Sequence, residues 1–255
     1  MKSRLLIALL GFACVAILPA AEPAAPAAKQ PVLVSVHGAW AGGWQFKRTA
    51  VLLEAKGWKV YRPSMSGLGE HFNTARTDIG LATHIDDIVN FILFEDLHDV
   101  ILLGHSYGGM VITGVADRIP ERISRLIYLD AFLPVDGESV MTIRKVGALP
   151  VEKMEKGGFI IPNWVKPGKP FPIDVPHPMK TFTDPIVLKN QAAAAKIPAT
   201  YVLTVDKGRK PEDDDFFPSA ERAKARGWSV LIMEADHVPM WRQPEATADL
   251  LSSLH

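Results

Sequence analysis

The chain repeats one pattern that few folds accommodate: short apolar runs, many of them β-branched, alternate with amphipathic helical segments. In the segment 81–94, five aliphatic side chains recur at helical spacing and fall on one face. Continuous apolar runs that alternate with helices are typical of parallel strands covered on both faces. We therefore expect one α/β domain over 31–255, with helices at 45–56 and 81–94 and about six strands in a mostly parallel sheet: Val32–Val36, Lys59–Tyr61, Val100–Leu103, Leu126–Leu129, Tyr201–Val205 and Val230–Met233.

One long segment interrupts this alternation. Between Phe132 and Lys196 the sequence offers no clear strand and is punctuated by prolines, from Pro150 to Pro185. Long segments without regular structure inside a compact domain usually have a function. We expect an inserted lid over about 132–196, and the alternative is a surface excursion without a role.

The most specific motif is Gly104-His105-Ser106-Tyr107-Gly108-Gly109, which directly follows an apolar strand and precedes an apolar helix. A sharp strand-to-helix turn presents a serine hydroxyl at the end of a sheet, and flanking glycines let the strand and helix approach closely. The helix N-terminus beneath it favours developing negative charge. Ser106 is therefore the predicted nucleophile.

A serine hydroxyl needs a base to take its proton, and the expected chain order is serine, acid, histidine. Two of the histidines that follow Ser106, His177 and His237, are the candidates for this base. His177 lies in the proline-rich segment, where the sequence shows nothing that would fix it. His237 lies between the last strand and the terminal helix, so it is the predicted base.

Several aspartates compete for the role of orienting the base. Asp206 ends the run Tyr201–Val205 and is the preferred candidate. Asp130 ends the run Leu126–Leu129 and remains a competitor, and the acidic run 213–215 is a third possibility. Asp236 is adjacent to the predicted base and is expected to be too strained to orient it.

An oxyanion hole requires two backbone N–H groups near the serine. One is expected from Tyr107, which follows the nucleophile, and the other from Ala39 in the loop after the first strand. The other residues of that loop, His37, Gly38 and Trp40, are expected to contact substrate. Trp40, Trp44 and Trp241 either line an apolar pocket or pack in the core.

Taken together, His37-Gly38-Ala39-Trp40, Gly104 to Gly109, Val205-Asp206-Lys207 and Ala235-Asp236-His237 resemble the α/β-hydrolase branch that holds plant methylesterases, hydroxynitrile lyases and bacterial esterases. The resemblance runs from Pro31 to the end and is weakest in the expected lid. It implies the α/β-hydrolase fold, a triad of Ser106, Asp206 and His237, and oxyanion donors at Ala39 and Tyr107. It also favours Asp206 over Asp130.

Three positions separate this chain from the lyases of that branch, which carry Thr, Glu and Lys where this chain has Gly38, His105 and Val238. The lyase lysine stabilises departing cyanide, and valine cannot. We therefore expect a carboxylesterase that acts on a small-molecule ester without metal or cofactor. The alternatives are lactone, amide or thioester hydrolysis by the same triad, or a triad-retaining binding protein with negligible turnover.

The overall charge gives no sign of a charged partner. Lys plus Arg and Asp plus Glu both number 28, so no basic field attracts nucleic acid or an anionic membrane. The oligomeric state is left open.

The N-terminus predicts export. Lys2 and Arg4 precede an apolar run from Leu5 to Leu18, and the small residues Ala20 and Ala21 follow it. This pattern is typical of a signal peptide over 1–21. An Ala- and Pro-rich leader over 22–30 follows. We therefore expect a periplasmic or secreted protein without stable membrane insertion once the signal is removed. Cys14 is the only cysteine, so the mature chain would have no disulfide or thiolate site.

Overall fold

The computed structural model describes residues 30–144 and 149–254. Its centre is a six-stranded sheet in the order β2-β1-β3-β4-β8-β9, and all its strand pairings are parallel. This confirms the predicted α/β-hydrolase sheet. Its strands are β1 (Val32–Val36), β2 (Lys59–Tyr61), β3 (Val100–Ser106), β4 (Ile123–Ala131), β8 (Ala199–Val205) and β9 (Ser229–Glu234).

Every strand expected in this sheet forms, but β3, β4, β8 and β9 extend beyond the apolar runs. The extra residues of β3 and β4 include His105, Ser106 and Asp130, whose polar side chains broke the apolar pattern. Pairing with β4 keeps His105 and Ser106 in the sheet, whereas Asp130 lies at an irregularity of β4. The polar carboxyl ends of the strands are therefore the least predictable part of the sheet.

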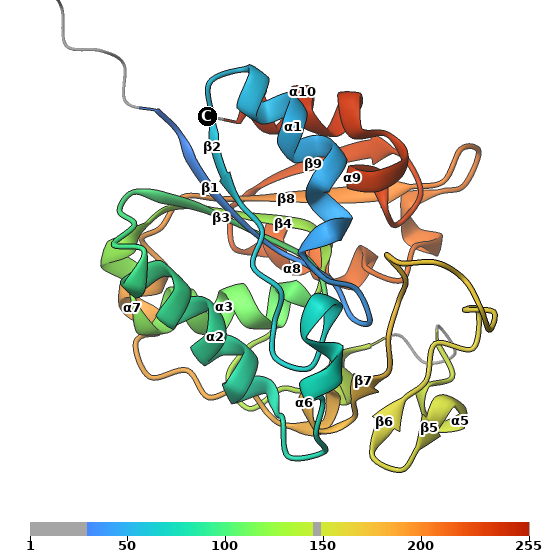
Figure 1. The fold of residues 1–255 in the computed structure, drawn as a ribbon. Helices are drawn as coiled ribbons and strands as arrows, with labels where there is room; N and C mark the ends of the chain where they lie inside the picture. The colour runs from blue at the N-terminus through green and yellow to red at the C-terminus, as the bar shows by residue number, and fades with distance from the viewer. Residues whose placement is uncertain (1–29, 145–148, 255) are drawn as a thin grey trace, which may run out of the picture.

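Helices cover the two faces of the sheet (Figure 1). On one face lie α1 (Lys47–Ala55), α9 (Pro239–Arg242) and α10 (Pro244–Ser253); on the other lie α2 (Leu81–Phe94), α3 (Gly108–Arg118) and α8 (Phe217–Ala225). Side chains alternate between these layers along each strand, as the period of two requires. Leu33 packs into the layer with α1 and α10, and Val34 packs into the layer with α2 and α3.

Short 3-10 helices shape the connections between these elements. They are η1 (Gly43–Phe46), η2 (Gly69–Thr74), η3 (Pro120–Arg122) and η4 (Pro211–Asp213). The expected helix at 45–56 is thus divided into η1 and α1, whereas the helix at 81–94 forms α2 with the predicted bounds.

The residues between β4 and β8 are here called the cap segment (132–198), and the buried apolar side chains among its described residues join the same core layer as α2 and α3. Its elements are α4 (Val140–Ile143), α5 (Val151–Met154), β5 (Glu155–Lys156), β6 (Phe159–Ile160), β7 (His177–Pro178), α6 (Lys180–Thr183) and α7 (Gln191–Ala194). The three strands pair as an antiparallel sheet. These strands could not be read from the sequence, because two residues are too few to establish a strand periodicity.

The expected signal peptide and nearly all of the leader at 22–30 lie outside the described residues. Across residues 30–144 and 149–254, no helix combines the length and apolar character needed to cross a membrane.

Candidate active site

The turn after β3 has the geometry of a nucleophile elbow. Ser106 has a φ of +55°, a conformation that is strained for a side chain with a Cβ atom. A Cβ atom at Gly104 would lie 2.6 Å from the carbonyl oxygen of Gly108, and one at Gly109 would lie 2.0 Å from that of Phe132. Strand and helix therefore meet at a distance that only glycine permits, as the motif predicted.

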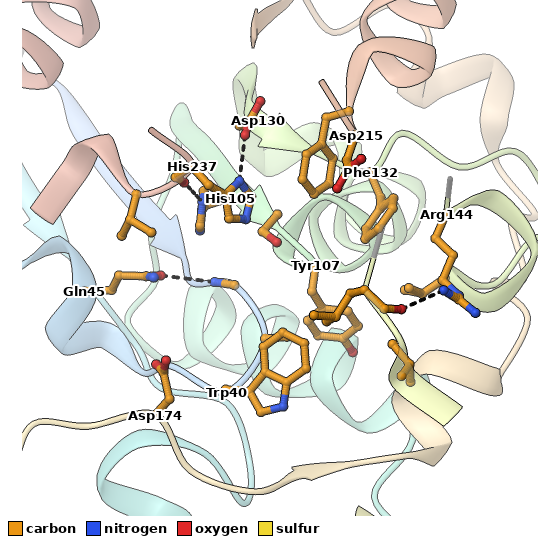
Figure 2. A pocket seen from close by; sticks show the side chains of 18 of the residues that line it. Trp40, Gln45, His105, Tyr107, Asp130, Phe132, Arg144, Asp174, Asp215 and His237 are labelled. Atoms are coloured by element: carbon orange, nitrogen blue, oxygen red, sulfur yellow. Dashed lines mark hydrogen bonds and ion pairs between the residues drawn. The ribbon is translucent and has the colours of Figure 1, made fainter. Parts of the chain in front are cut away.

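His237 lies in the loop between β9 and α9, and its ring is held on two sides. Its Nδ1 is 2.6 Å from Oδ2 of Asp130 (Figure 2). Its ring also stacks on Phe216, with centroids 4.9 Å apart. An ionised carboxylate accepts hydrogen bonds only, so Nδ1 carries the proton and Nε2 is the basic nitrogen. Ser106 and His237 line the same cavity.

Asp206, the preferred acid, is the wrong residue for this contact. Asp206 is exposed, and its side chain makes no hydrogen bond or ion pair with the described residues. Asp130 is 1% exposed, and its second oxygen, Oδ1, accepts a hydrogen bond from the backbone N–H of Thr204 at 3.0 Å. The competitor that the sequence ranked second is therefore the partner of His237.

The reason lies in the order and register of the strands. β4 is the direct neighbour of β3, and the register shifts there so that Ser106 pairs with Ala131, passing over Asp130. Asp130 has a φ of +47° at this irregularity. Asp206 follows β8, one strand farther from the serine. The carboxylate of Asp130, on the strand next to β3, is therefore better placed than that of Asp206 to contact a histidine that must also face Ser106.

Two opposing effects act on the pKa of His237. Desolvation by the surrounding protein lowers it, although 42% of the side chain is exposed, while the hydrogen bond and charge of Asp130 raise it. The net effect raises the pKa of His237 above its ordinary value of 6.5. The ring therefore gains affinity for a proton, as a general base requires.

His105, the residue before Ser106, holds the loop that carries His237. Its Nε2–H donates to the backbone carbonyl of His237 at 2.6 Å (Figure 2), and the two rings are 4.6 Å apart. Burial, first, and the proximity of His237 hold the pKa of His105 well below 6.5, so it stays neutral. The sequence comparison with lyases singled out this position without giving its role.

The loop after β1 carries the other predicted site residues. Gly38, Ala39 and Trp40 line the cavity, whereas His37, which was also expected to contact substrate, is not among its lining residues. His37 is fully buried: its Nδ1–H donates to the carbonyl of Gly38 at 2.8 Å, and its Nε2 accepts the N–H of Met65 at 3.1 Å. Burial lowers its pKa to about 4, so it is neutral.

The role of His37 is therefore to fix a peptide plane. In a trans peptide the C=O and N–H point in opposite directions. With the Gly38 carbonyl held by His37, the N–H of Ala39 points the other way. No acceptor in the described part of the chain takes the backbone N–H of Ala39 or of Tyr107. Both groups also belong to residues that line the cavity.

The cavity has a volume of about 540 Å³ and is walled by both the core and the cap segment. Trp40 lies across it from His237 and His105 (Figure 2). Trp44 and Trp241 do not line it; they pack edge to face on each other instead. Its other aromatic and apolar lining residues include Phe132, Val140, Leu149, Val151, Trp164, Phe182, Phe216 and Val238.

Carboxylates are the main charged groups on the wall. Asp174, Asp214 and Asp215 line the cavity in addition to Asp130. Burial and then the negative charge of Asp130 raise the pKa of Asp214 to about 6. Burial also raises the pKa of Asp174, whose carboxylate accepts the indole N–H of Trp164 at 2.8 Å.

The two arginines on the wall are already paired. Arg144 forms an ion pair with Glu152, and Arg242 pairs with Asp236 at 2.7 Å. Neither partner carboxylate lines the cavity. The balance of charge at the wall is therefore negative.

Known proteins resemble this chain over most of its length. The model of the alpha/beta hydrolase family matches residues 33–250. A carbendazim hydrolyzing esterase from Nocardioides sp. (strain SG-4G) is 36% identical, over 87% of this chain and 98% of its own. Methylesterase 1 from Arabidopsis thaliana is 25% identical, over 85% and 92%.

The fold agrees with these sequence relatives. An extracellular alpha/beta-hydrolase from a Paenibacillus species superposes with a TM-score of 0.73 at 25% identity, covering 88% of this chain and 98% of its own. The chain belongs to the alpha/beta hydrolase family, among its carboxylesterase-type hydrolases.

Proposed function

We propose that this protein hydrolyses a small-molecule carboxylic ester through an acyl-enzyme on Ser106, with His237 as general base and Asp130 as its orienting acid. One observation carries the proposal: a buried carboxylate holds Nδ1 of His237 at 2.6 Å, in the cavity that also contains the strained Ser106. This is the arrangement that leaves Nε2 free to take a proton.

In the first half-reaction, Ser106 Oγ attacks the ester carbonyl carbon while its proton passes to Nε2 of His237. The carbonyl oxygen becomes an oxyanion, which the N–H groups of Ala39 and Tyr107 stabilise. The imidazolium is stabilised by the charge of Asp130 and then gives its proton to the departing alcohol. The products of this step are the acyl-serine and the free alcohol.

In the second half-reaction, water replaces the alcohol. Nε2 of His237 takes a proton from the water as its oxygen attacks the acyl carbon, and the same N–H groups stabilise the second oxyanion. The bond to Ser106 Oγ then breaks, and His237 returns the proton to the serine. The acid is released, and no metal or cofactor takes part in either step.

The cavity wall supports a neutral substrate with an apolar acyl or alcohol group. Its aromatic lining buries apolar surface, whereas the carboxylates of Asp174, Asp214 and Asp215 repel an anionic group. Because the charges of Arg144 and Arg242 are already paired with other carboxylates, they attract an acidic substrate less than unpaired arginines would. Carbendazim belongs among the trial substrates because the Nocardioides relative is named for its hydrolysis.

The test is hydrolysis of p-nitrophenyl esters from acetate to octanoate, with Ser106→Ala as the matched control. We expect turnover by the parent protein and loss of turnover in the variant, and the optimal chain length will measure the pocket. A folded parent protein that hydrolyses no ester would contradict the proposal.

Labelling with a fluorophosphonate separates the alternatives. Labelling at Ser106 together with turnover of a lactone, amide or thioester, but of no ester, would move the function to that substrate. Labelling without any turnover would favour a binding protein. Absence of labelling would reject Ser106 as the nucleophile.

We also propose that residues 1–21 direct export and are then removed. The support is the sequence pattern of a charged start, an apolar run and small residues. Expression in a bacterial host, followed by fractionation and N-terminal sequencing, tests this. A mature protein in the periplasm or medium that begins at Glu22 is expected; an uncleaved chain in the cytoplasm would contradict the proposal.

A further inference from the structure

Trp40, which follows the proposed oxyanion donor Ala39, has an unusual backbone that the cap segment holds in place. Its φ is +63°, a conformation that bulky side chains rarely adopt unless the surroundings impose it. Its N–H donates to Nδ1 of His177 at 3.2 Å, and its carbonyl accepts the N–H of Val175 at 2.8 Å. Its indole N–H donates to the carbonyl of Ile160 at 2.9 Å. All three partners belong to the cap segment.

The partner of the Trp40 N–H is a histidine whose protonation is fixed. His177, in β7, is fully buried, and burial holds its pKa well below 6.5, with smaller contributions from His84 and His37. Because the Trp40 N–H can only donate, Nδ1 of His177 is the acceptor and its proton is on Nε2. That Nε2–H donates to the hydroxyl of Thr181 at 2.7 Å.

The hydrogen bonds continue from His177 through Thr181 within the cap segment. The Thr181 hydroxyl donates in turn to the carbonyl of Pro178 at 2.8 Å. The rings of Phe182 and Trp40 also pack against His177, with centroids 5.2 and 6.0 Å away. His177 therefore has one orientation, and the direction of its acceptor nitrogen is set before substrate binds.

We propose that His177 is a positioning residue for the oxyanion hole, acting from the cap segment through the Ala39–Trp40 peptide. Ala39 lies between two peptide planes. His37 of the core holds the plane before it through the Gly38 carbonyl, and His177 holds the plane after it through the Trp40 N–H. With both planes fixed, the direction of the Ala39 N–H is fixed as well.

The consequence is that the oxyanion hole is complete only with the cap segment in its place on the core. One N–H, that of Tyr107, comes from the elbow, whose strand and helix position it. The other, that of Ala39, depends on His37 and also on a contact between residues that are 137 positions apart. This inference rests on the proposed ester hydrolysis, because an oxyanion hole has no role without it.

The test compares His177→Phe with His177→Asn. Phenylalanine retains a ring but has no acceptor, whereas the side-chain oxygen of asparagine can take the place of Nδ1. Loss of an oxyanion donor costs about 10²–10³ in kcat, so a misdirected donor is expected to lower kcat by at least about 10-fold in His177→Phe, with KM changed far less. His177→Asn should recover most of the lost kcat.

A transition-state analogue provides the readout that a merely structural role would not change. A trifluoromethyl ketone that matches the best ester forms a tetrahedral oxyanion on the serine. Its inhibition constant should rise in His177→Phe by the same factor by which kcat/KM falls. His71→Phe, an exposed histidine outside this cavity, is the control for the substitution and should leave both values unchanged.

Two results would overturn the inference: a kcat in His177→Phe within about 2-fold of the parent, or an analogue affinity that does not follow kcat/KM. If His177→Phe does not fold, Trp40→Phe decides: it keeps the backbone N–H bond to His177 and removes the indole bond to Ile160 together with part of the cavity wall, so it should give a smaller loss with the same proportionality. An inactive parent protein would instead reject the ester hydrolysis, and the positioning role with it.

Discussion

Replacing Asp130 by asparagine tests the central geometry of the site. The carboxylate is 1% exposed and lies 2.6 Å from Nδ1 of His237, so solvent cannot take its place. In Asp130→Asn the new amide can keep the bond from the Thr204 N–H through its oxygen and donate its own N–H to Nδ1. Nδ1 would then be unprotonated and Nε2 would carry the proton, the wrong tautomer for a base.

The size of the effect follows from the loss of tautomer and charge together. The corresponding change in a well-studied serine protease lowers kcat by about 10⁴, so we expect a loss of about 10³–10⁴ here, or about 4 to 5 kcal/mol in activation free energy. KM should change little, because Asp130 acts through His237. The matched control is Asp206→Asn, an exposed carboxylate, which should retain the parent kcat.

The assay is steady-state hydrolysis of the best p-nitrophenyl ester across pH, with thermal unfolding measured for each variant. Because Asp130 raises the pKa of His237, any residual activity of Asp130→Asn should persist to lower pH than that of the parent. A large loss in Asp206→Asn with a nearly normal Asp130→Asn, both folded, would refute our assignment of the acid and restore the residue that the sequence preferred.

Two further predictions concern pH. The kcat/KM of the parent should fall on acidification with a midpoint above 6.5, because His237 must be neutral and its pKa is raised; a rate that stays flat from pH 8 to pH 5 would contradict this. Stability should also fall with acidification. Burial lowers the pKa of both His37 and His84 to about 4, so their contribution is present above 6.5 and is lost as pH falls from 6.5 towards 4. Each lost contribution reaches about 3 kcal/mol at the acid end. Urea unfolding at pH 7.5 and 5.0 checks this, and equal midpoints would contradict it.

The sequence by itself determined the framework of the protein. Strand and helix periodicity predicted the parallel sheet, because burial on two faces selects continuous apolar runs. The elbow was also readable, since the glycines around Ser106 are required by contacts between one strand and the helix that follows it directly. His237 was found for a similar reason: it is the histidine in the loop directly after the last strand.

Tertiary structure alone decided which groups meet. Asp130 and Asp206 both end strands at one edge of the sheet, and only the strand order and the irregularity beside Ser106 select Asp130. The sequence showed nothing that would hold His177, because its partner Trp40 is 137 positions away. His37 was expected to contact substrate because a loop motif does not reveal which of its side chains are buried. Local patterns report the elements that neighbouring residues form; they do not report distances between side chains from distant segments, and the chemistry of this site depends on those distances.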